Sequence, residues 1–80
     1  MSVTILFLGP LGDLAGEAQR EVNAPLDWTG LLEAVGPDIA EQLQSDRVRV
    51  ACQGRVLADK CTLSANDGDE IALLPPVSGG

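Results

Sequence analysis

Histidine and tyrosine are absent from this chain of 80 residues, and aromatic residues make up only 2% of it. Its two cysteines, Cys52 and Cys61, do not form a Cys-x-x-Cys pair. Because zinc sites draw on histidine and cysteine at short spacings, the sequence offers few metal ligands, and we expect no bound metal. With Phe7 and Trp28 as its aromatic residues, the chain also lacks a platform on which nucleic-acid bases could stack.

Basic residues are scarce as well, since five stand against twelve acidic ones and the formal net charge is −7. This charge repels nucleic-acid phosphates and anionic membranes, and it favours partners that present Lys and Arg. No apolar run approaches the roughly 20 residues that span a bilayer, and the first residues lack the basic segment of a signal peptide. We expect a cytoplasmic protein that binds neither membranes nor nucleic acids, with both cysteines reduced.

The length of the chain limits it to one domain with one core. A hydrophobic content of 45% is enough for that core to fold. So small a domain leaves little room for a catalytic pocket. We therefore expect the chain to act through partner enzymes and not as an enzyme by itself.

The first quarter of the chain predicts two strands. Residues 3–8 are β-branched or apolar and stop at a Gly-Pro pair, which indicates a buried strand. Residues 17–23 alternate between apolar and polar, which indicates a more exposed second strand. Residues 9–16 carry three glycines without the spacing of a phosphate-binding loop, so we expect a hairpin loop there.

A helix is predicted next. Asp27 has the position of an N-cap, and Trp28, Leu31, Leu32 and Val35 follow at helical spacing. The pair at residues 36–37, Gly-Pro, predicts the end of the helix. Residues 38–44 continue the apolar stripe and predict a short second helical turn.

The second half predicts three more strands. Residues 47–52 alternate and send Val48, Val50 and Cys52 to the core, residues 55–57 form a short strand, and residues 70–74 form the last one. Leu63 is expected as a lone anchor in a loop, and residues 66–69 as a turn. The prediction is the α+β class, a β-grasp domain over residues 1–74 in which one main helix packs on one face of a mixed sheet.

The C-terminal tail, residues 75–80, reads Pro-Pro-Val-Ser-Gly-Gly. The proline pair keeps the chain extended, so the tail can reach about 20 Å from the domain. Gly79 and Gly80 make its end thin enough to enter a tunnel in another protein. Since a carboxylate is inert until activated, the chemistry requires a partner that uses ATP, and this chain binds no cofactor. The alternative is an end that frays or a cloning remnant.

Residues 67–80, Asp-Gly-Asp-Glu-Ile-Ala-Leu-Leu-Pro-Pro-Val-Ser-Gly-Gly, resemble the C-terminal signature of the small subunit of molybdopterin synthase, the MoaD family. Residues 3–8 and 14–16 are also similar to that family, and the predicted order of elements fits it along the whole chain. The middle of the chain matches only in pattern. Two departures are residues 51–54, Ala-Cys-Gln-Gly, where relatives often have a turn that contains asparagine, and the leucines at 73 and 74, where relatives are often bulkier.

The resemblance implies a ubiquitin-like sulfur carrier. Gly80 would be adenylated by an adenylyltransferase similar to ubiquitin-activating enzymes and converted to a thiocarboxylate, and Gly79 would be needed for passage of the tail. The large subunit of molybdopterin synthase would bind Leu74, Pro75, Pro76, Val77 and Ser78. There the thiocarboxylate would donate sulfur to cyclic pyranopterin monophosphate, within a heterotetramer.

Three alternatives remain open from the sequence. The chain is a sulfur carrier for thiamin or thiouridine synthesis, a ubiquitin-like protein modifier, or an interaction domain that does not use its tail. As a modifier it would have few sites at which further copies could be attached to form polymers, because Lys60 is its only lysine.

An apolar patch is expected on the face of the sheet away from the helix. Leu6 and Leu8 would lie there with either Leu73 or Leu74, and Leu74 with Val77 would be the main contacts of an interface. Cys61 lies beside Lys60 and could act as a thiol nucleophile or sulfur relay, although an incidental loop cysteine is favoured.

Overall fold

The computed structural model describes residues 1–76. The predicted roles of Val77, Ser78, Gly79 and Gly80 lie outside the described residues. The strands are β1 (Ser2–Phe7), β2 (Gln19–Asn23), β3 (Leu26–Asp27), β4 (Arg49–Cys52), β5 (Arg55–Val56), β6 (Ser64–Ala65) and β7 (Glu70–Leu74). The helices are α1 (Pro10–Ala15), α2 (Trp28–Val35), α3 (Pro37–Leu43) and the short 3₁₀ helix η1 (Lys60–Thr62).

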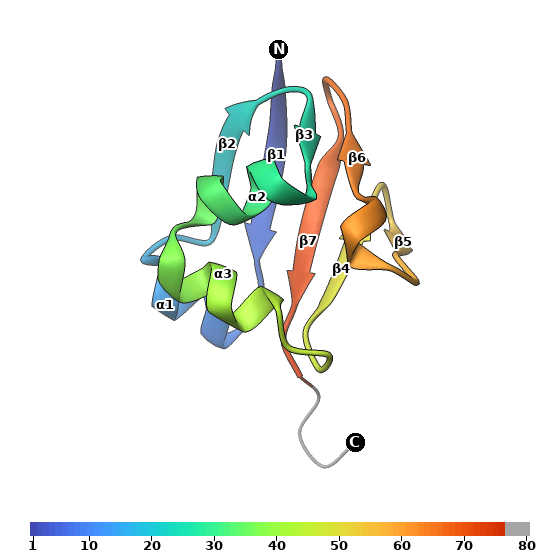
Figure 1. Ribbon diagram of the computed structural model, residues 1–80. Helices are drawn as coiled ribbons and strands as arrows, with labels where there is room; N and C mark the ends of the chain where they lie inside the picture. Colours follow the sequence, from blue (N-terminus) through green and yellow to red (C-terminus); the bar gives the residue numbers. More distant parts are fainter. Residues whose placement is uncertain (77–80) are drawn as a thin grey trace.

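A five-stranded mixed sheet in the order β2-β1-β7-β4-β5 forms the body of the protein (Figure 1). β1 and β7 pair in parallel, and the other neighbouring pairs are antiparallel. The last strand therefore lies in the middle of the sheet, beside the first. This is the β-grasp arrangement that the sequence predicts.

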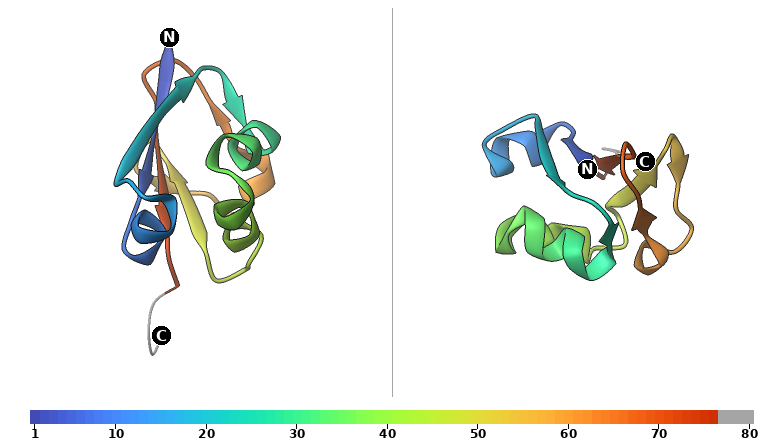
Figure 2. Two further views of the ribbon diagram at one scale, coloured as in Figure 1. Left: turned by 90° about the vertical axis from the view of Figure 1, so that its left-hand side faces the viewer. Right: turned by 90° about the horizontal axis from the view of Figure 1, so that it is seen from above.

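Helices α2 and α3 cover one face of the sheet (Figure 2). The Asp27 side chain accepts a hydrogen bond from the Gly30 amide at 2.7 Å, so the predicted N-cap is confirmed. The predicted second turn is confirmed as α3. The core between these helices and the sheet is made of fully buried aliphatic side chains, the largest being Ile5, Leu31, Ile39, Leu43, Ile71, Leu73, Val3, Val48 and Val50.

β1 and β2 pair as the predicted hairpin, but the prediction that residues 9–16 form an irregular loop between them is wrong. The segment forms helix α1. Pro10 lies in the first turn, where its missing N–H costs nothing, and Gly16 ends the helix in the left-handed conformation. Leu11 is buried in the core, and this burial stabilises a helix that its glycine content disfavours.

The sequence also missed a small second sheet. β3 and β6 pair antiparallel, with Leu26 opposite Ala65. Leu63 is buried as predicted, but it comes just before this sheet and after η1 rather than in an irregular loop. Cys52 faces the core as predicted, but it is only half-buried at the end of β4, whereas Val50 on the same strand is fully buried.

Candidate functional site

The tail leaves the domain from the carboxyl end of the middle strand. β7 ends at Leu74, and the neighbouring β1 runs in the same direction, so both strands finish at the same end of the sheet (Figure 1). The Leu8 amide donates a hydrogen bond to the Leu73 carbonyl at 3.4 Å. Pro75 is half-buried and Pro76 is exposed. The predicted partner-binding residues 74–76 thus lie where the last strand leaves the sheet.

Gly9 contacts this exit from the turn between β1 and α1. Its φ of 56° and ψ of −133° suit glycine and few other residues. A Cβ atom at this position would lie 3.3 Å from Cγ of Pro75, which is tighter than ordinary contact. The missing side chain therefore allows Pro75 to pack closely against the turn.

An apolar row crosses the sheet on the face opposite α2 and α3. The register places Leu6 beside Ala72, Ala72 beside Ala51, and Ala51 beside Val56. Side chains at paired positions share one face of a sheet, so these residues form a continuous row over four strands. The two alanines in its middle keep the row shallow.

A second row lies next to it, at the base of the tail. Leu74 pairs with Arg49, while Leu73 pairs with the buried Val50 and belongs to the core. Of the two leucines between which the sequence could not decide, Leu74 is therefore the one on the sheet face away from the helices. Leu8, just beyond β1, is 39% exposed, and Val56 at the other end of the first row is 54% exposed. We call this surface the outer patch. Its members are Leu6, Leu8, Val56, Ala72 and Leu74, and Ala51 between them is itself buried, at 8% exposure.

Charge is distributed unevenly over the same face. At the end of the sheet far from the tail, Thr4 has Glu21 on one side and Glu70 on the other. Near the tail, Arg49 borders Leu74. A protein that binds this face would need an apolar centre and basic groups opposite the two glutamates.

Neither cysteine is placed at the tail exit. Burial raises the pKa of the Cys52 thiol, and the neighbouring Asp69 carboxylate raises this pKa further, so Cys52 is a poor nucleophile. Cys61 is exposed. The Lys60 ammonium donates hydrogen bonds to three backbone carbonyls and not to Cys61. This arrangement does not favour the alternative in which Lys60 makes Cys61 a nucleophile. Within residues 1–76, no helix has the length and apolar character needed to cross a membrane.

Known proteins share this fold, and the similarity includes the tail. Residues 5–80 match the ThiS family. Small archaeal modifier protein 1 (SAMP1) of Haloferax volcanii is 26% identical, with a TM-score of 0.76 and 100% of both chains covered. A chain from the complex of subunits 1 and 2 of the molybdopterin-converting factor of Helicobacter pylori is 30% identical, with a TM-score of 0.68 and 100% of both chains covered.

A third structure supports the fold alone. The putative subunit 1 of the molybdopterin-converting factor of Pyrococcus furiosus is 21% identical, with a TM-score of 0.71, covering 96% of this chain and 99% of that one. No curated protein matches the chain. The family match spans nearly the whole sequence and includes the diglycine, and the chain therefore belongs to the ThiS family, as a ubiquitin-like sulfur carrier of the ThiS/MoaD type.

Proposed function

We propose that the chain is the sulfur-carrying small subunit of a molybdopterin synthase. The family match through residue 80 carries this proposal, together with the exit of the tail from the middle strand beside the outer patch. The 30% identity to a chain of the Helicobacter pylori complex favours this pathway. In this proposal residues 1–74 are the folded domain, and residues 75–80 are the tail that works in partner active sites.

The chemistry takes place at the carboxylate of Gly80. An adenylyltransferase joins this carboxylate to the phosphate of AMP from ATP, with release of pyrophosphate. A hydrosulfide or equivalent sulfur nucleophile attacks the activated carbonyl, a C–S bond forms and AMP leaves. The resulting thiocarboxylate is the nucleophile that transfers its sulfur to cyclic pyranopterin monophosphate. The partner supplies acid, base and anion-binding groups, and Gly79 keeps the end narrow enough to enter the partner.

The outer patch is the docking surface in this proposal. Leu74 joins the patch to the tail, so a protein bound on the patch would receive Pro75 and Pro76 at a fixed point of entry. Val77 and Ser78 would follow into its active site. Because the activating enzyme and the large subunit both need the tail, they would bind this surface in turn. The resemblance to the small subunit of molybdopterin synthase implies a heterotetramer of two small and two large subunits.

The first experiment is mass spectrometry of the tail after incubation with ATP, the adenylyltransferase and a sulfur donor. We expect a sulfur-for-oxygen exchange confined to Gly80. Localisation by fragmentation is essential, because oxidation of Met1 or a cysteine adds nearly the same mass. A chain lacking Gly80 and a chain with one extra residue after it are the controls. If the extended chain transfers sulfur as well as the natural one, the proposal is wrong.

Reconstitution then separates the pathways. With the large subunit and cyclic pyranopterin monophosphate, the thiocarboxylate chain should yield molybdopterin, whereas transfer only into thiamin or thiouridine synthesis would point to those carriers. Similarity to SAMP1, named as a modifier, favours a second function in which the tail forms isopeptide bonds. Conjugates of higher mass in cells, lost on removal of Gly79 and Gly80, would support that function.

A further inference from the structure

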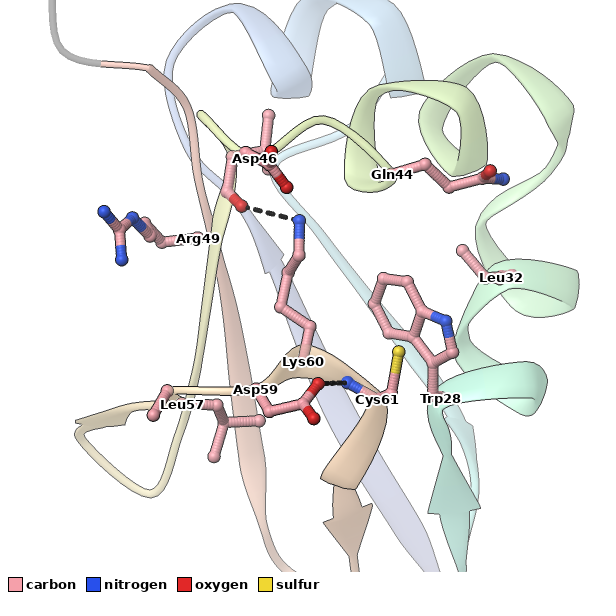
Figure 3. Close-up of a pocket in the computed structure, with 11 residues that line it drawn as sticks. Trp28, Leu32, Gln44, Asp46, Arg49, Leu57, Asp59, Lys60 and Cys61 are labelled. Carbon is pink, nitrogen blue, oxygen red and sulfur yellow. Dashed lines mark hydrogen bonds between the residues drawn. The ribbon is translucent and has the colours of Figure 1, made fainter.

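The side chain of Lys60 is held by the backbone of a distant segment. Its Nζ atom donates hydrogen bonds to the carbonyl oxygens of Leu43 at 2.6 Å, Ser45 at 2.7 Å and Val48 at 3.0 Å. Figure 3 shows the side chain running from η1 to the segment before β4, with Trp28 beside it. The Nζ atom lies 5.9 Å from the centroid of the Trp28 ring. Lys60 thus connects η1 to the end of α3 and the start of β4.

The Ser45 carbonyl also accepts a hydrogen bond from the Val48 amide at 3.2 Å, so Lys60 is a second donor there. α3 ends at Leu43, and the last carbonyls of a helix have no partner within the helix. The segment that follows turns toward β4, so its carbonyls lie outside the sheet ladder. An ammonium group carries three N–H donors, one for each of the three carbonyls. Lys60 therefore works as a cap for α3 and for the turn after it.

The same geometry blocks the chemistry of an acceptor lysine. An isopeptide bond forms when a neutral amine attacks an activated carbonyl: a C–N bond forms, AMP or a thiol leaves, and the nitrogen loses a proton. The attack needs an open lone pair on Nζ. In the folded chain Nζ is surrounded by its own Cε and three carbonyl oxygens. A lone pair freed by deprotonation would face one of these oxygens instead of an incoming acyl group.

We propose that Lys60, the only lysine of the chain, is a structural clamp, and that the folded protein offers no lysine acceptor for an isopeptide bond. The protein passes on its own C-terminal glycine but does not carry a second copy of itself on a lysine. This inference goes beyond sulfur carriage, since it holds whether the tail delivers sulfur or is conjugated to other proteins. Polymeric chains linked through Lys60 do not form.

Acylation of the folded full chain tests the clamp without any partner. The probe is an acetyl ester of N-hydroxysuccinimide, with the modified sites mapped by mass spectrometry. Arg55→Lys supplies an internal reference, because Arg55 is exposed on β5 and the change keeps the charge. We expect Lys60 to react more than about ten-fold more slowly than the introduced lysine, since reaction requires hydrogen bonds to an ammonium to open. In concentrated guanidinium chloride the two should react alike.

Equal rates in the folded protein would overturn the proposal. A second measurement uses the activating enzyme and ATP with the Arg55→Lys chain in excess. Any lysine-linked conjugate between copies should map to position 55, and a branched peptide at Lys60 would also overturn the proposal. Because acylation needs neither ATP nor a sulfur donor, failure of this inference is distinguishable from failure of the sulfur-carrier proposal.

Discussion

Replacing Lys60 by methionine should destabilise the protein strongly, since the change keeps much of the aliphatic stem and removes the ammonium. The lost hydrogen bonds are 2.6, 2.7 and 3.0 Å long, and each bond to a charged group contributes about 1.5–3 kcal/mol. They share one charge, and water replaces part of the interaction because the site is only part-buried. We therefore expect a loss of about 2–4 kcal/mol, a large fraction of the total stability of a small domain.

The assay is urea unfolding at neutral pH, with thermal melting as a second probe. A loss of this size should lower Tm by about 10–25 °C in a domain of this length. Arg55→Met is the matched control, since Arg55 is an exposed cation on β5, and its effect should stay within about 0.5 kcal/mol. If the two variants lose the same small amount of stability, the hydrogen bonds of Lys60 do not hold the fold together.

The other predictions concern the outer patch, a strained turn and a buried thiol. Leu8→Glu should weaken binding of the large subunit about ten-fold or more, whereas Leu14→Glu, on another exposed leucine, should not; equal effects in titration calorimetry would remove the outer patch from the interface. Gln53 has a φ of 54°, which asparagine tolerates better, but its Nε2 atom donates a hydrogen bond to Asp69 Oδ1 at 2.7 Å that the shorter asparagine loses. The two effects oppose each other, so Gln53→Asn should change the free energy of unfolding by less than about 0.5 kcal/mol, and a gain above about 1 kcal/mol in urea unfolding would contradict this. In the folded protein the pKa of the Cys52 thiol lies above its ordinary value of 9.0, because burial and, to a smaller extent, the Asp69 carboxylate disfavour the thiolate. As the pH rises above 9.0, the unfolded chain therefore loses this proton before the folded chain does, and the contribution of Cys52 to stability falls. Comparison with Cys52→Ala across this range should show a shallower decline in the variant, and parallel curves would refute the assignment.

Local patterns in the sequence were sufficient for most of the elements. Asp27 as N-cap and the apolar stripe through Leu31 and Val35 predicted α2, because capping and helical spacing act within a few residues. The alternation in residues 70–74 predicted β7. The proline pair and the diglycine predicted a narrow extended tail for the same reason, although its end lies beyond the described residues.

Helix α1 shows where local signals fail. Three glycines and a proline within residues 9–16 indicate a loop, since glycine disfavours a helix by roughly 0.5–1 kcal/mol. Burial of Leu11 offsets part of this cost, but it depends on α3 and β1, which come from other parts of the chain. The β3 and β6 pair was missed for a similar reason, because two-residue strands have no periodicity of their own.

The sequence by itself determined the order of the main strands and helices and the glycine-ended tail, because each follows from the residues close to it along the chain. It left Leu73 and Leu74 undecided, since alternation requires one inside and one outside but does not say which. Pairing of Leu73 with Phe7 and Val50 placed it in the core and put Leu74 on the outer patch. Only the tertiary structure showed that Lys60 caps carbonyls 12 to 17 positions away, because such contacts depend on packing between distant segments.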